Sequence, residues 1–176
     1  MRRLLLLRHA KAVQDTGEGD HDRALNERGR KDATHMGHAM DVRGYLPDLV
    51  LCSDALRTTE TWNLLSLELA RPPKVEFTKA LYLASPKSIL AQILETAHTV
   101  KTLALVGHNP GIEECAIRLA RKPISKAESH KLEDMRAKFP TCALAVLDFE
   151  VESWSDARGG GILLEFTDGK LGMVAT

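Results

Sequence analysis

Three short apolar runs constrain the fold of this chain most strongly. They lie at residues 4–7 (LLLL), 48–52 (DLVLC) and 102–106 (TLALV). Apolar runs of this length, bounded by polar residues, are typical of strands that are buried on both faces of a parallel sheet. Helical patterns separate the runs, so the sequence predicts an α/β fold, a three-layer αβα sandwich with a mostly parallel sheet.

The segments between and after these runs complete the predicted architecture. Asn26 is expected to cap a helix that continues to about residue 40, and Ser53 or Asp54 to cap the next. Further helices are expected at about residues 86–97 and 112–121, and a short strand at 75–77. Two later runs, 142–149 and 161–166, flank a glycine triplet and predict an antiparallel hairpin at the sheet edge. The charged residues 123–140 are expected to form a surface excursion.

The length and the charge balance exclude several classes of protein. No repeat or linker divides the 176 residues, so we expect one domain over residues 1–176. The chain holds 24 Lys and Arg against 24 Asp and Glu, which gives no net field toward nucleic acid or an anionic membrane. Arg2 and Arg3 precede too few apolar residues for a signal peptide. We therefore expect a cytoplasmic protein with no nucleic-acid or membrane partner; the sequence carries no signal for an oligomeric state.

Polar side chains follow each of the three runs. They are Arg8 and His9 after the first run, Ser53 and Arg57 after the second, and His108 and Asn109 after the third. The carboxyl ends of parallel strands meet at one edge of a sheet, where ligands bind. Gly107 is expected to allow a tight turn there, and the helix start that follows offers free N–H groups to an anion. The sequence therefore predicts one pocket that contains two histidines and two arginines.

This combination of residues suits phosphoryl chemistry. A phosphoryl group carries about two negative charges near neutral pH, and the planar guanidinium of arginine matches two of its oxygens. A neutral imidazole can attack phosphorus if its other nitrogen is bonded to a carbonyl. We expect His9 to be this nucleophile, with Arg8, Arg57 and a charged His108 holding the oxygens. Such chemistry needs neither a metal nor another cofactor.

Three ordered motifs, at residues 7–10, 53–61 and 107–110, resemble those of the histidine phosphatase superfamily, which has the phosphoglycerate-mutase-like fold. Residues 23–29 and the compact length are most similar to its SixA-like phosphohistidine phosphatase branch. The resemblance, which covers about residues 3–120, implies that His9 is the phosphorylated nucleophile. It also implies that Arg8, Arg57 and His108 form the phosphate pocket. The further candidates for substrate binding are Arg23, Asn26, Ser53 and Asn109.

The chain departs from the superfamily that it resembles in the group that protonates the leaving group. Residues 77–82, where one branch has an acid, contain none, and Asn109 stands where another branch has aspartate. Glu76, Glu113 and Glu114 are nearby candidates. A substrate with a good leaving group fits best, so we expect phosphohistidine in a protein. The alternatives are a small phosphorylated molecule as substrate, or a phosphate-binding module without catalysis.

A cysteine-dependent phosphatase site and a histidine metal site are both less consistent with the sequence. Cys52 and Arg57 have the spacing C-x4-R, which is one residue short of a cysteine-dependent phosphatase loop. Cys52, Cys115 and Cys142 form no C-x-x-C pair, and each is expected to be a small buried side chain. His21, His35 and His38 are expected to be solvated rather than to bind a metal.

Overall fold

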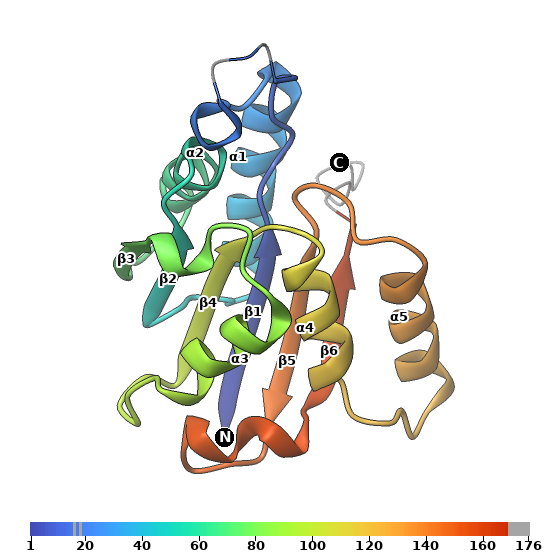
Figure 1. The fold of residues 1–176 in the computed structure, drawn as a ribbon. Helices are drawn as coiled ribbons and strands as arrows, with labels where there is room; N and C mark the ends of the chain where they lie inside the picture. The colour runs from blue at the N-terminus through green and yellow to red at the C-terminus, as the bar shows by residue number, and fades with distance from the viewer. Residues whose placement is uncertain (16, 18, 169–176) are drawn as a thin grey trace.

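The computed structural model describes residues 1–15, 17 and 19–168, and in this part of the chain six strands form one mixed sheet (Figure 1). The strand order is β3 (Lys74–Thr78), β2 (Leu49–Ser53), β4 (Thr102–Gly107), β1 (Arg2–Arg8), β5 (Leu144–Phe149) and β6 (Ile162–Thr167). The first four strands are parallel, whereas β5 and β6 are antiparallel to their neighbours. The predicted sheet, with its antiparallel edge, is therefore confirmed.

Helices cover both faces of the sheet, as predicted. The helices α1 (Glu27–Val42) and α2 (Leu56–Ser66) pack on one face. On the other face lie α3 (Pro86–Leu94), α4 (Gly111–Leu119) and α5 (Lys126–Ala137). Alternate leucines of β1 serve the two cores, since Leu4 and Leu6 pack toward α3, α4 and α5, while Leu5 and Leu7 pack toward α1 and α2. Both faces are buried, so the run is apolar throughout.

The helix α5 corrects the expectation that residues 123–140 form only a charged surface excursion. Ser125 caps α5 by accepting a hydrogen bond from the backbone N–H of Glu128. The helix buries only Leu132 and Met135, against the core beneath α4. Because its other side chains are mostly charged, its apolar periodicity is weak.

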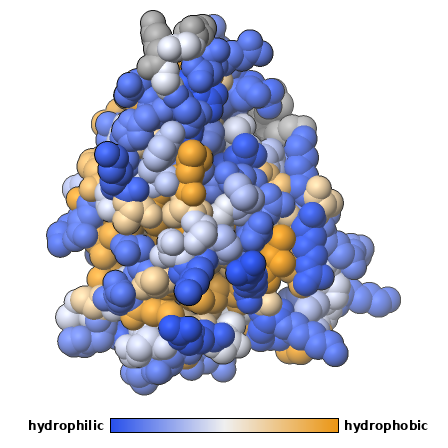
Figure 2. Space-filling view, in the orientation of Figure 1, coloured by the Kyte–Doolittle hydropathy of each residue, from blue (hydrophilic) through white to orange (hydrophobic). Residues whose placement is uncertain are grey.

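Much of the visible surface is hydrophilic (Figure 2). Figure 2 shows that hydrophilic residues predominate on the upper part of the visible face, above the carboxyl ends of β1, β2 and β4, while apolar residues gather lower down. Within residues 1–15, 17 and 19–168, no helix has both the length and the apolar character required to cross a membrane.

The contact between α1 and α2 depends on Gly37. A Cβ at this position would lie 2.3 Å from the carbonyl oxygen of Leu65 on α2. We expect Gly37→Ala to lower the free energy of unfolding by about 1–3 kcal/mol, because the helices would be forced apart, although alanine favours helix by about 1 kcal/mol. Urea denaturation measures this. Gly159→Ala, which adds a Cβ into open space, is the control, and equal stability of the two variants would contradict the close contact.

Candidate active site

Three side chains that follow the predicted strands lie together at the carboxyl edge of the sheet. β2, β4 and β1 are adjacent, and the loop from β1 to α1 passes over their ends (Figure 1). The ring centroids of His9 and His108 are 5.3 Å apart. Arg57 lies in the first turn of α2, is 2% exposed, and its Nη2 is 3.1 Å from Nδ1 of His108. The structure thus brings His9, Arg57 and His108 to one place.

The imidazole of His9 is buried and its tautomer is fixed. Its Nδ1 lies 2.7 Å from the carbonyl oxygen of Ala10, which can only accept, so Nδ1 carries the proton and Nε2 keeps its lone pair. Burial, followed by the charges of Arg57, Arg8 and Arg23, lowers the pKa of His9 to about 4, against the opposing effect of the Ala10 hydrogen bond. At neutral pH His9 is therefore an uncharged imidazole with a free Nε2.

Hydrogen bonds from the segments on either side of His9 hold its backbone in place. The N–H of His9 donates to the carbonyl of Gly107, and its own carbonyl accepts from the N–H of Cys142. The next N–H, that of Ala10, donates to the hydroxyl of Thr61 at 2.9 Å. That hydroxyl in turn donates to the carbonyl of Arg57. These bonds set the position of the imidazole relative to α2 and to Arg57.

His108 is also neutral in this arrangement. The guanidinium of Arg57 can only donate, so Nδ1 of His108 accepts from it. Nε2 must then carry the proton, which it donates to the hydroxyl oxygen of Ser53 at 2.8 Å. Burial and the charge of Arg57 lower the pKa of His108 to about 3. The charged His108 expected in a phosphate complex therefore requires an anion beside it.

Ser53 is the last residue of β2 and does not cap helix α2. Helix α2 begins at Leu56, and its N-cap residue, Ala55, makes no side-chain cap bond. The prediction that Ser53 or Asp54 caps this helix is therefore wrong. The hydroxyl of Thr58 closes the turn instead, by donating to the carbonyls of Ser53 and Ala55. Ser53 is thereby free to contact His108.

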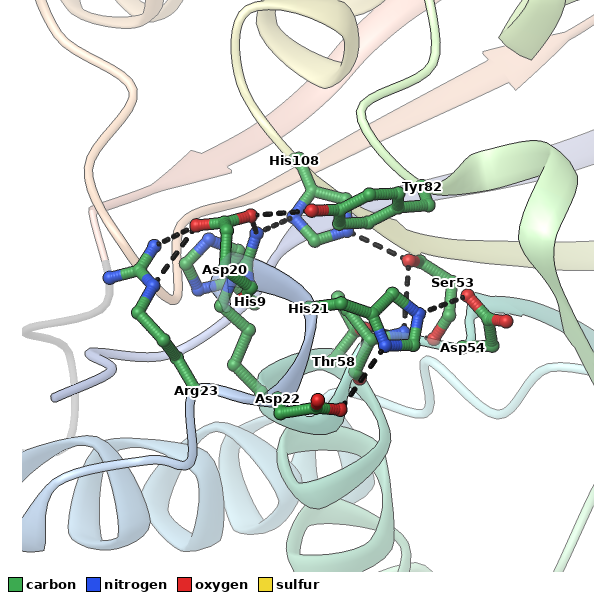
Figure 3. A network of polar contacts seen from close by, with 12 residues as sticks. His9, Asp20, His21, Asp22, Arg23, Ser53, Asp54, Thr58, Tyr82 and His108 are labelled. Atoms are coloured by element: carbon green, nitrogen blue, oxygen red, sulfur yellow. Dashed lines mark hydrogen bonds and ion pairs between the residues drawn. The ribbon is translucent and has the colours of Figure 1, made fainter. Parts of the chain in front are cut away.

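Sequence reasoning missed the carboxylate of Asp20, which lies in the middle of this group of residues (Figure 3). Asp20 begins the short 3-10 helix η1 (Asp20–Asp22). Its Oδ2 accepts from Nη2 of Arg57 at 2.9 Å and from the hydroxyl of Tyr82 at 2.7 Å. Its Oδ1 accepts from Nε of Arg23 at 3.0 Å and forms an ion pair with Nη2 of Arg23 at 2.8 Å. Tyr82, Arg23 and Arg57 together hold the pKa of Asp20 far below its usual range.

His21 borders this group and is not simply solvated, in contrast to the prediction. Its Nε2 lies 2.9 Å from Oδ1 of Asp54, and its ring meets the edge of Tyr82 at 4.8 Å between centroids. Asp54 raises the pKa of His21. His35 and His38 are exposed on α1, as expected. In the described part of the chain, no three histidine, cysteine, aspartate or glutamate side chains gather closely enough to hold a metal ion.

The side chains of Arg8, Asn109 and Asn26, which the sequence predicts in the site, contact other residues. The Nη1 of Arg8 and the Nδ2 of Asn109 both donate to the carbonyl of Phe139, at 2.9 and 3.0 Å. The positive charge of Arg8 still lowers the pKa of His9. Asn26 caps α1 as predicted, accepting from the N–H of Gly29 at 2.8 Å.

The glutamates considered as proton donors contact other partners. Glu113 accepts from the side chain of Asn109, Glu114 pairs with Arg118, and Glu76 pairs with Lys74 on the edge strand.

Gly107 has an ordinary φ within β4, so its turn-forming freedom is not used.

The three cysteines are free and buried, as the sequence indicated. Cys52 is fully buried, and burial raises the pKa of its thiol. A thiolate nucleophile at Cys52 is therefore strongly disfavoured.

The two buried histidines predict a loss of stability in acid. In the unfolded chain each titrates near pH 6.5, so between about pH 6.5 and 4 the unfolded state binds more protons than the folded state. Stability is therefore lost as the pH falls through this window. We expect His108→Gln to flatten the pH dependence of the free energy of unfolding by up to about 1.4 kcal/mol per pH unit. Urea denaturation from pH 4 to 7 checks this, and identical slopes would contradict it.

Comparisons with known proteins agree with this geometry. A sequence profile of the histidine phosphatase superfamily (branch 1) matches residues 4–81. An uncharacterized protein of Mycobacterium tuberculosis is 36% identical over 154 residues, which cover 88% of this chain and 93% of that protein. The chain belongs to the histidine phosphatase superfamily.

Two solved structures of proteins named SixA are similar to this chain over nearly its whole length. The putative phosphohistidine phosphatase SixA from Nakamurella multipartitia superposes with a TM-score of 0.79 at 30% identity, covering 94% of this chain and 95% of that one. The corresponding SixA from Agrobacterium tumefaciens gives 0.77 at 31% identity, covering 94% and 97%.

Proposed function

We propose that this protein is a phosphatase that removes the phosphoryl group from phosphohistidine in a protein, through a phosphorylated His9. The observation that carries this proposal is the state of His9. It is buried and neutral, its Nδ1 is bonded to the carbonyl of Ala10, and its free Nε2 lies among cationic side chains. Such a nitrogen is a nucleophile at neutral pH.

In the first step, Nε2 of His9 attacks phosphorus and the bond from phosphorus to the substrate imidazole breaks. The bonding pair returns to the leaving nitrogen, and the distal nitrogen of that imidazole already carries a proton, so a neutral histidine departs. Arg57, Arg23 and Arg8 supply positive charge for the phosphoryl oxygens. The dianion favours protonation of His108, which then donates to an oxygen as well.

In the second step, water attacks phosphorus and the bond to Nε2 of His9 breaks. The electron pair returns to Nε2, both protons of the water leave with phosphate as the dihydrogen anion, and His9 regains its neutral form with Nδ1 bonded to Ala10. Neither step needs a proton from an additional acid.

The charge of Asp20 supports the choice of phosphohistidine over an alkyl phosphate. An alkoxide is a poor leaving group and requires a proton donor. The carboxylate in the site is kept ionised by Tyr82, Arg23 and Arg57. An aspartate displaced toward water is also ionised at neutral pH, so Asp20 holds no proton to give in either arrangement. An imidazole needs no such donor. The similarity to two proteins that are named as putative phosphohistidine phosphatases also supports this choice.

A substrate panel tests this function. We expect kcat/KM for a phosphohistidine peptide to exceed the values for a phosphoserine peptide and a sugar phosphate by at least about 100-fold, which is roughly 2.7 kcal/mol of transition-state stabilisation. Faster turnover of the sugar phosphate would replace the proposal with a small-molecule phosphatase. Binding of phosphate without turnover of any substrate would indicate a phosphate-binding module.

A further inference from the structure

The carboxylate of Asp20 already occupies the donors that a phosphoryl group would use. One oxygen accepts from Arg57 and Tyr82, and the other accepts from Nε of Arg23 and forms an ion pair with Nη2 of the same side chain. The backbone carbonyl of Asp20 takes a further N–H of Arg57, at 2.5 Å. Figure 3 shows this carboxylate between the side chains of Arg23 and Tyr82, with a dashed line to each. The chain therefore places an anion of its own where its cationic side chains converge.

A phosphoryl group and this carboxylate cannot share the same partners. Both terminal nitrogens of Arg57 make hydrogen bonds. Nη1 donates to the carbonyl of Asp20, and Nη2 donates to the carboxylate of Asp20 and to His108. The Nε of Arg57 is buried without a hydrogen-bond partner. Tyr82, Arg23 and Arg57 keep the carboxylate ionised. A dianion that entered beside it would meet a like charge, which is unfavourable. Any phosphoryl ligand must therefore displace Asp20 from Arg57 and Arg23.

We propose that Asp20 is a specificity-determining residue, a built-in competitor that weakens the binding of free phosphate to this pocket. Displacement costs the same charge-assisted bonds whatever the phosphoryl group is attached to. A phosphorylated protein compensates for this cost through contacts outside the pocket, whereas inorganic phosphate has no such contacts. Asp20 thereby limits inhibition by the product and by other small anions, since its carboxylate returns to the arginines as phosphate leaves. The inference rests on the proposed function in that the pocket binds phosphoryl groups and that its substrate is a phosphorylated protein.

Calorimetric titration with inorganic phosphate at constant pH tests this role. We expect Asp20→Asn and Asp20→Ala each to bind phosphate at least about tenfold more tightly than the unmodified protein. The side chain of Asp20 is 39% exposed, so neither change disturbs the core. Asp22→Asn removes one unit of negative charge from the same 3-10 helix, where Asp22 contacts only His21, at 3.5 Å, among the ion pairs of the described residues. This control is expected to stay within about twofold of the unmodified protein.

The outcomes separate this inference from the proposed function. Phosphate affinity that is unchanged or weaker in folded Asp20→Asn and Asp20→Ala overturns the competitor role, even if phosphohistidine is hydrolysed. A similar gain in Asp22→Asn would assign the effect to the net charge of the loop and would also overturn it. The titration requires no turnover. Failure of phosphohistidine as a substrate would therefore refute the proposed function and leave the result for Asp20 intact.

Discussion

Replacement of His9 by alanine is expected to lower kcat on a phosphohistidine peptide by at least about 10³-fold. The change removes the only atom that the account places in the bond-forming step, the free Nε2, while Arg57 and Arg23 keep their positions. The affinity for phosphate is therefore expected to change much less than kcat. Steady-state kinetics and phosphate titration on the same variant measure the two effects separately.

The exposed His35 on α1 provides the matched control for this experiment. His35→Ala removes the same side chain away from the pocket and is expected to retain full activity. If His9→Ala retained activity within about tenfold of the unmodified protein, His9 could not be the nucleophile.

Replacement of Arg57 by lysine is expected to lower kcat/KM by about 100-fold or more, although the charge is conserved. Arg57 reaches the carboxylate and the carbonyl of Asp20 and also Nδ1 of His108, through two nitrogens of one rigid fork. An ammonium group cannot reproduce this geometry or bind two phosphoryl oxygens side by side. The loss should be visible in kcat as well as in KM, because Arg57 holds the oxygens while charge develops on them.

Arg118→Lys is the matched control, since Arg118 lies on α4 with an exposed side chain paired to Glu114. It is expected to leave kcat/KM within about twofold of the unmodified protein. Equal activity of Arg57→Lys and Arg118→Lys would mean that the site requires only a positive charge at position 57, which would contradict the proposed bidentate role.

The fold was predictable from the sequence wherever burial imposes a pattern. The run at residues 4–7 is buried on both faces of β1, and the run at 102–106 falls within β4. The side chains after three adjacent strands could be placed together because the edge of a parallel sheet is a consequence of topology. Helix α5 was missed because it buries only Leu132 and Met135 among charged residues.

The group of residues around His9 was predictable only in part, since some of its contacts join distant and irregular segments. Asp20 meets Arg57 and Tyr82 across 37 and 62 residues of sequence, and residues 14–23 carry no periodicity that would indicate this. Arg8 is the last residue of β1 and contacts Phe139, whereas His9 follows the strand and lies beside His108. Ser53 has the residue type of a helix cap, and only the start of α2 at Leu56 shows that it serves another contact.

In the proposed mechanism His9 carries the phosphoryl group on Nε2. The most direct test is a rapid acid- and base-quench experiment with a radiolabelled phosphohistidine peptide, followed by NMR of the trapped protein. We expect a transient, acid-labile and base-stable label at Nε2 of His9, because Nδ1 is bonded to the carbonyl of Ala10. A label at Nδ1, a label on another residue, or turnover with no labelled protein at any time would contradict it.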